Sequence, residues 1–158
     1  MRAFMNDNST NEGLTEFVTA IIGGQLFGLP IARVQDVFMP DKITRVPLAS
    51  ADVAGILNLR GRIVTAINMH CRLGLTRPEA SGALMAIGIE FKGESYGLLI
   101  DSVGEVLKLV AAERQPNPVN LDPALARVSA GVYRLSSQLL VILDVDRLLE
   151  RGGNAMAA

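Results

Sequence analysis

The chain has 158 residues, a length that suits one domain or two small, closely packed ones. Hydrophobic residues make up 49% and charged residues 20%, so a substantial core can form, and without tryptophan it must be mainly aliphatic. The net charge of −1 gives no basic field for a nucleic-acid backbone, and the single cysteine excludes an internal disulfide.

Both ends of the sequence differ from the middle. Residues 1–14 are polar and lack the apolar centre of a signal peptide, and residues 152–158 form a short tail, so we expect a disordered arm and a loose end. No apolar run approaches the roughly 20 residues needed to cross a bilayer. We therefore expect a cytoplasmic protein without direct membrane insertion.

The middle of the chain is an internal repeat. Residues 22–37 align without a gap with residues 91–106, and ten of the sixteen positions are similar or identical. Residues 55–73 align in the same way with residues 131–149, after a connection that is seven residues longer in the second copy. The duplication predicts two similar structural units.

In chain order, each copy predicts two strands around a glycine-containing turn, a third strand, a long loop, two more strands and a short helix. In the first copy we expect Asn68 to cap this helix and Gly74 to lie near its end. In the second copy Asp144 is the expected cap. The long loop of each copy should also contain a helical turn, at residues 50–55 in the first copy and after Asp122 in the second, where Asp122 is the expected cap and Pro123 the first helical residue.

Four or five short strands in each copy argue for an all-β fold of two small, intimately packed β-barrels, because each copy has too few residues for βαβ units. We place the first lobe in residues 15–78 and the second, with the C-terminal helix, in residues 79–151. Each lobe would be marginally stable alone. Residues 139–145 are apolar on both faces of the predicted strand, which indicates burial between the lobes.

The copies differ at the turn between their last two strands. The first copy reads NLRG at residues 58–61, and the second reads RLSS at residues 134–137. Gly61 permits a positive φ or the close approach of another chain. Arg60 has two interpretations: a solvated turn residue of no consequence, or an anchor for a partner protein, since arginine is enriched among the residues that dominate interfaces.

Several motifs resemble, in the same order, those of the CheW family, the coupling proteins of bacterial chemotaxis. They span residues 16–150 and read GGQLFGLPIARVQDVF, ITRVP, GILNLRGRIV, YGLLIDSVGEVL and LLVILDVDRLL. The resemblance implies two five-stranded, SH3-like β-barrels with a hydrophobic core between them. It also implies a non-catalytic adaptor without metal or cofactor, recruited to membrane-associated arrays. Its partners would be the helical tips of chemoreceptors, the histidine kinase CheA and other CheW copies.

The resemblance also assigns roles to particular positions. It implies receptor-binding positions at Ile31, Val34, Asp36, Val37, Arg60 and Gly61. We expect a groove between the lobes, lined by Ile31, Val34 and Val37, to accept the apolar ridge of a receptor tip, with Arg60 at its rim. It implies a kinase contact through the loop that contains Met39, Pro40, Asp41 and Ile43. Two further positions, Gly97 and Val106, match lobe-interface or coupling positions. The first helix departs from the family pattern, with Asn68 at a usual Asp and His70 at a usual Arg.

Two other functions are alternatives to the adaptor. For an enzyme, the candidate base and nucleophile are His70 and Cys71, which are adjacent and point apart on a helix. We expect a partly exposed histidine beside a buried cysteine, with no catalytic role. The alternative of an SH3-like peptide-binding module outside chemotaxis would need an aromatic cluster for proline-rich ligands, and the chain has only seven aromatic residues.

Overall fold

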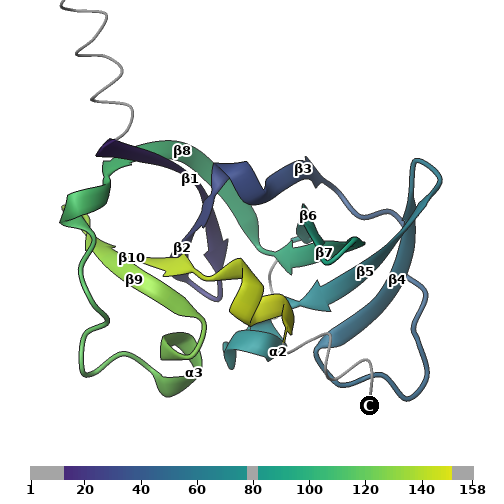
Figure 1. The fold of residues 1–158 in the computed structure, drawn as a ribbon. Coiled ribbons are helices and arrows are strands. Elements are labelled where there is room, and N and C mark those ends of the chain that lie inside the picture. Colours follow the sequence, from purple (N-terminus) through teal and green to yellow (C-terminus); the bar gives the residue numbers. More distant parts are fainter. Residues whose placement is uncertain (1–12, 78–81, 151–158) are drawn as a thin grey trace, which may run out of the picture.

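A computed structural model describes residues 13–77 and 82–150, and these form ten strands in two five-stranded mixed sheets with short helices (Figure 1). The expectation of a mainly β fold with two five-stranded units is confirmed. The predicted loose tail lies outside the described residues, as does the predicted arm except for residues 13 and 14. Residue 14 already belongs to the first strand, so the ordered fold begins one residue earlier than expected.

Sheet A has the strand order β8-β1-β2-β10-β9. Its strands are β1 (Leu14–Ile22), β2 (Gln25–Pro30), β8 (Ser102–Val110), β9 (Ser129–Arg134) and β10 (Leu139–Leu143). Sheet B has the order β3-β6-β7-β5-β4. Its strands are β3 (Val34–Phe38), β4 (Val53–Leu59), β5 (Arg62–Asn68), β6 (Met85–Phe91) and β7 (Glu94–Ile100).

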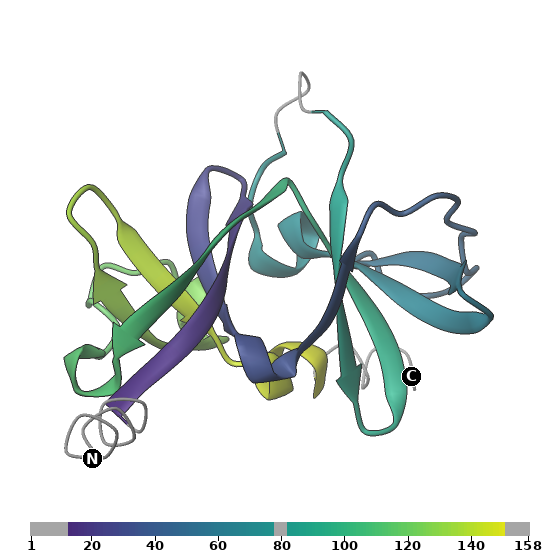
Figure 2. The ribbon, with the colours of Figure 1, turned by 90° about the horizontal axis from the view of Figure 1, so that it is seen from above.

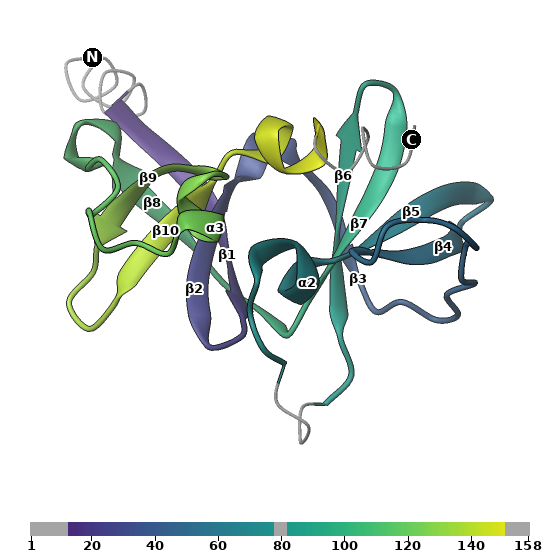
Figure 3. The ribbon, with the colours of Figure 1, turned by 90° about the horizontal axis from the view of Figure 1, so that it is seen from below.

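Short helical segments connect these strands. They are the 3-10 turns η1 (Ile31–Arg33) and η2 (Ala111–Glu113), the α-helices α2 (Met69–Leu73) and α3 (Pro123–Ala126), and helical residues 145–150. Viewed from below, α2 and residues 145–150 lie between the two sheets (Figure 3). None of the helices in the described ranges has the length and apolar character to cross a bilayer.

Each sheet takes strands from both copies of the repeat, so the expected division into lobes of residues 15–78 and 79–151 is wrong. The first hairpin, β1–β2, pairs with β8 and β10 of the second copy, and β6–β7 pairs with β3 and β5 of the first. The chain changes sheet at η1 and again between β7 and β8 (Figure 2). The two copies have therefore exchanged their first hairpins.

The hydrophobic core lies in three places. The largest cluster joins the sheets and includes Phe27 and Leu29 of sheet A and Ile87 and Leu98 of sheet B. Two smaller clusters lie within sheet A and within sheet B. In β10, alternate residues enter the cluster between the sheets and the cluster within sheet A, which confirms the predicted burial of this strand on both faces.

The predicted helix caps are confirmed. Asn68 Oδ1 accepts a hydrogen bond from the Cys71 amide, and Gly74 ends α2 with a left-handed φ of 70°. Asp122 Oδ1 accepts a hydrogen bond of 2.8 Å from the amide of Ala124, with proline at the first position of α3. Each copy therefore encodes its helix start locally.

Candidate functional site

Arg60 occupies a two-residue turn between β4 and β5, where Leu59 pairs with Arg62. The φ angles of Arg60 and Gly61 are 52° and 84°, a conformation that favours Asn-Gly and costs a residue such as arginine roughly 1–2 kcal/mol. Asn58 Oδ1 supports the turn by accepting a hydrogen bond of 2.9 Å from the Gly61 amide. Arginine is therefore not the residue that the turn itself requires.

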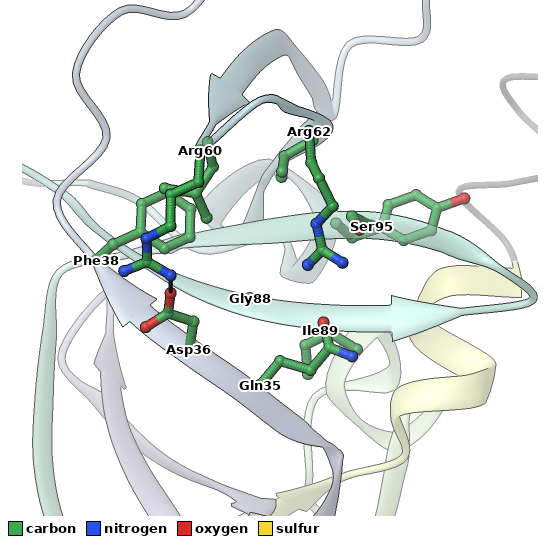
Figure 4. A pocket seen from close by; sticks show the side chains of 11 residues that line it. Gln35, Asp36, Phe38, Arg60, Arg62, Gly88, Ile89 and Ser95 are labelled. Carbon is green, nitrogen blue, oxygen red and sulfur yellow. Dashed lines mark hydrogen bonds and ion pairs between the residues drawn. The ribbon is translucent and has the colours of Figure 1, made fainter.

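The guanidinium of Arg60 reaches across sheet B to Asp36 on β3. Arg60 Nη1 lies 2.9 Å from Asp36 Oδ2, and the arginine side chain is 76% exposed (Figure 4). Since β3 and β4 are the two outer strands of sheet B, this ion pair joins its opposite ends. A pair this exposed contributes only about 0–1 kcal/mol to folding.

Beneath this ion pair lies a pocket of about 440 Å³. Apolar side chains that include Phe38, Leu59 and Val64 form its walls, and Arg62 enters it from the same hairpin as Arg60 (Figure 4). Ser95 adds a small polar side chain. The pocket therefore combines apolar walls with two guanidinium groups.

The strand β3 presents the predicted receptor residues on two different faces. Val34 and Val37 pair with Ile89 and Ile87, which belong to the core between the sheets, whereas Asp36 pairs with Gly88 beside the pocket. A bulge between residues 34 and 36 places both valines on one face. The expectation of one groove with Arg60 at its rim is therefore wrong: Arg60 and Asp36 meet on the opposite face of β3.

The apolar face of β3 is partly open. Ile31 of η1 is 39% exposed and Val37 is 38% exposed, while Val34 packs against the core. Val106 on β8 pairs with Val18 and shares its face with Leu29 of the core between the sheets, yet it is 49% exposed. Val106 thus lies at the open margin of the face that joins the sheets.

Gly97 faces the interior of sheet B and not the core between the two sheets. A Cβ atom on this residue would lie 3.3 Å from Val64 Cγ1 and 3.5 Å from Phe38 Cζ, both within sheet B. Glycine leaves room there for the aromatic ring of Phe38.

The predicted kinase loop follows β3. Met39 is 64% exposed, Asp41 is exposed and Pro40 is half-buried. Ile43 instead packs against the core within sheet B, next to the bridge between Thr44 and Ile56. Ile43 therefore anchors the loop, while the apolar side chain of Met39 is exposed at the surface.

The expected exposures of His70 and Cys71 are reversed: the histidine is buried and the cysteine is exposed. His70 Nε2 lies 2.9 Å from Asp101 Oδ2, which also accepts a hydrogen bond from the Gly23 amide. Burial alone would raise the pKa of Asp101, but these hydrogen bonds and the charges of His70 and Arg77 lower it below the ordinary value. The pair joins α2, a hairpin turn of sheet A and the crossing after β7.

A second buried pair was not found from the sequence. The Arg72 side chain, 1% exposed, pairs with Asp52 and also donates a hydrogen bond to the backbone oxygen of Leu148. Burial would raise the pKa of Asp52, but the hydrogen bonds from Ser50 and Arg72 and the charge of Arg72 lower it. An arginine spaced among the apolar residues of a helix was the signal in the sequence.

The sequence and the fold were compared with those of known proteins. A model of the CheW-like domain matches residues 16–152. The chain belongs to the CheW-like domain family. Across the part of the chain that the structure describes, no cluster of three or more His, Cys, Asp or Glu side chains is placed to hold a metal ion.

Relatives of this CheW-family chain come from distant bacteria. It is 26% identical over 134 residues to the chemotaxis protein CheW of Klebsiella aerogenes, covering 85% of this chain and 81% of the relative. It is 27% identical over 135 residues to CheW of Thermotoga maritima, covering 85% and 87%. The crystal structure of the scaffolding protein TtCheW from Thermoanaerobacter tengcongensis superimposes with a TM-score of 0.72 at 27% identity, covering 82% of this chain and 88% of that one.

Proposed function

We propose that this protein couples the cytoplasmic tips of chemoreceptors to the histidine kinase CheA within signalling arrays, as a cytoplasmic adaptor. That it is a chemotaxis scaffold of a non-catalytic family follows from its CheW-like domain and its relatives. The partners, and the residues that contact them, are the proposal.

The observation that supports it most is the placement of Arg60. The side chain is 76% exposed, and its backbone has a φ of 52°, which disfavours arginine. Its ion pair with Asp36 adds little to folding. A residue that the turn does not need, held outward with a rigid fork of donors, suits recognition of a partner. We assign Arg60, with Gly61 and Asp36, to the receptor contact.

Two apolar surfaces extend this assignment. The partly exposed side chains of Ile31 and Val37 suit the apolar ridge of a helical receptor tip. On the loop after β3, Met39 is 64% exposed and suits the kinase, with Pro40 and Asp41 beside it. Contacts of this size are weak individually, so the strength of an array would come from many of them together.

The alternative of an SH3-like peptide reader has less support. Six of the seven aromatic residues lie in the described ranges, and five of these are buried: Phe17, Phe27, Phe91, Tyr96 and Tyr133. Within those ranges no exposed aromatic groove is present to hold a proline-rich ligand.

The test is co-purification with a receptor cytoplasmic fragment and with CheA of the same organism. Wild type should bind both, and Arg60→Asp should retain CheA while losing most receptor binding, by roughly 10-fold or more. Arg60→Asn should give the same loss while keeping the turn, because asparagine is favoured there. Arg127→Asn, which removes an exposed arginine beside α3, is the matched control. Equal receptor binding by wild type and both Arg60 variants would remove this residue from the proposal.

A further inference from the structure

The repeat allows the pocket of sheet B to be compared with the same place in sheet A. Val64 pairs with Ser95 in sheet B, and the equivalent pair in sheet A is Leu140 with Leu26. The two leucines pack together in the core of sheet A. At the equivalent place, sheet B is hollow, with a pocket of about 440 Å³. The hollow is therefore an addition to the common fold and not a requirement of it.

The pocket of sheet B also carries positive charge that the equivalent place in sheet A lacks. Arg60 and Arg62 stand where sheet A has Ser136 and Gln138. Arg62 pairs with Leu59, which packs against the core of sheet B, so the arginine lies on the same face of the sheet, at the exposed end of β5. Sheet B thus has two guanidinium groups at its hollow, and sheet A has none at the equivalent positions.

One of these guanidinium groups lacks a carboxylate. Asp36 pairs with Arg60, and its other oxygen accepts a hydrogen bond from the Val37 amide. Among the described residues, no carboxylate oxygen lies within 4.0 Å of a nitrogen of Arg62. Arg62 also lines the adjoining hollow with Glu90 and Glu94, whose carboxylates stay beyond 4.0 Å of its nitrogens and accept hydrogen bonds from the neutral donors of Gln35 and Tyr96. The pocket therefore has a donor fork without an acidic partner.

We infer that this pocket receives the side-chain carboxylate of an aspartate or glutamate from the protein that Arg60 contacts, which under the proposed function is the receptor. Arg62 supplies paired donors for the carboxylate, and Phe38 and Val64 accept its methylene groups. The volume suits one or two side chains and is too small for a helix. The inference rests on the proposed function and adds to it Arg62 and Ser95 as determinants of which partner binds.

The test measures binding to a purified cytoplasmic fragment of a receptor from the same organism. Arg62→Gln removes the free donor fork, and Ser95→Leu fills the pocket with the residue of sheet A without changing the charge. Each should weaken binding by about 5- to 30-fold. Arg127→Gln, an equal loss of charge on an exposed arginine beside α3, should bind within about twofold of wild type. Thermal unfolding of each variant shows that it is folded.

A second arm identifies the carboxylate. Each acidic residue of the receptor fragment is changed in turn to its amide. One of these fragment variants should bind the wild-type protein as weakly as the Arg62→Gln protein binds the unchanged fragment. For that variant, Arg62→Gln should cause no further loss. The inference of a carboxylate site would be wrong if Arg62→Gln and Ser95→Leu both bound the fragment within twofold of wild type, or if every amide variant lost the same binding affinity. Either result would leave the role of Arg60 intact. Failure of wild type to bind the fragment would overturn the proposed function and this inference together.

Discussion

His70 Nε2 contacts Asp101 Oδ2 at 2.9 Å, and the repeat places the same kind of contact, with the acidic and basic residue types exchanged, at the other crossing between the sheets. The residue equivalent to His70 is Asp146, and it pairs with Arg33 of η1 at 2.9 Å. Each pair ties a short helix to a segment where the chain changes sheet. The two differ in exposure: the side chain of His70 is 6% exposed and that of Asp146 is 63% exposed.

The difference in exposure predicts unequal stability effects. His70→Ala should lower the free energy of unfolding by about 1–3 kcal/mol, because the carboxylate of Asp101 loses a partner in a half-buried position. Asp146→Ala, which breaks the exposed pair, should cost no more than about 1 kcal/mol. Urea denaturation of both variants measures this directly, and an equal effect of the two would contradict it.

Stability should also fall in acid. The pKa values of Asp52 and Asp101 are lower in the folded protein than their ordinary value, so the unfolded chain binds more protons at acid pH. Their contribution is complete above about pH 4 and is lost as the pH falls through the folded pKa values. Urea midpoints between about pH 2.5 and 6 should show this slope. The slope should be shallower in Asp101→Asn, and an unchanged slope would rule out this source.

Arg72 should be among the most sensitive positions. Arg72→Met removes the partner of Asp52 and the donor to the oxygen of Leu148, and it should destabilise the protein by about 3–5 kcal/mol. Arg127→Met, at an exposed site, should change stability by less than about 0.5 kcal/mol. Denaturant titration of the two variants compares the buried arginine with the exposed one.

Two glycines with positive φ should respond differently to alanine. At Gly55 a Cβ atom would lie 2.2 Å from the backbone oxygen of Thr44. Gly55→Ala should therefore break the β-bridge between Thr44 and Ile56 and prevent normal folding. At Gly61 no heavy atom lies within 4 Å of the Cβ position, so Gly61→Ala should cost only about 1 kcal/mol, from its φ of 84°. Circular dichroism and thermal unfolding separate the two, and a well-folded Gly55→Ala protein would contradict the steric argument.

The loop after β3 gives a prediction for the kinase. Met39→Ser should weaken binding to CheA by about 10-fold while leaving receptor binding and stability unchanged, because this side chain is exposed and packs against no core cluster. Val119→Ser, another fully exposed apolar residue, is the control and should change neither. Calorimetric titration with CheA measures the effect, and full affinity of Met39→Ser would move the kinase contact elsewhere.

The sequence predicted the strands and helix starts better than it predicted which strands pair with one another. Glycine positions, alternation and caps marked the strands and both helix starts, and residues 139–145 are buried on both faces as expected. The repeat did not reveal the exchange of hairpins, because two separate units and two exchanged units have the same aligned pattern. Only the pairing of β10 with β2 and of β5 with β7 distinguishes them.

The site was predicted in part. The position of Arg60 in an exposed turn followed from the difference between the copies, and its exposure is as expected. The division of β3 into two faces did not follow, because a bulge shifts the alternation by one residue at Gln35. The burial of His70 was missed because its partner, Asp101, is 31 residues away and reaches it only through the crossing after β7.

The exchange of hairpins also bears on synthesis. The first hairpin to leave the ribosome, β1–β2, finds its sheet neighbours only in β8 and β10, the latter ending at Leu143. Until then, side chains such as Phe17 and Phe27 have no finished sheet to cover them. Such long-range pairing slows folding and leaves nascent chains open to aggregation. The ribosome must therefore have released the chain as far as Leu143 before β2 has both of its neighbours in sheet A, and a chain stopped before that residue would be a target for chaperones or proteases.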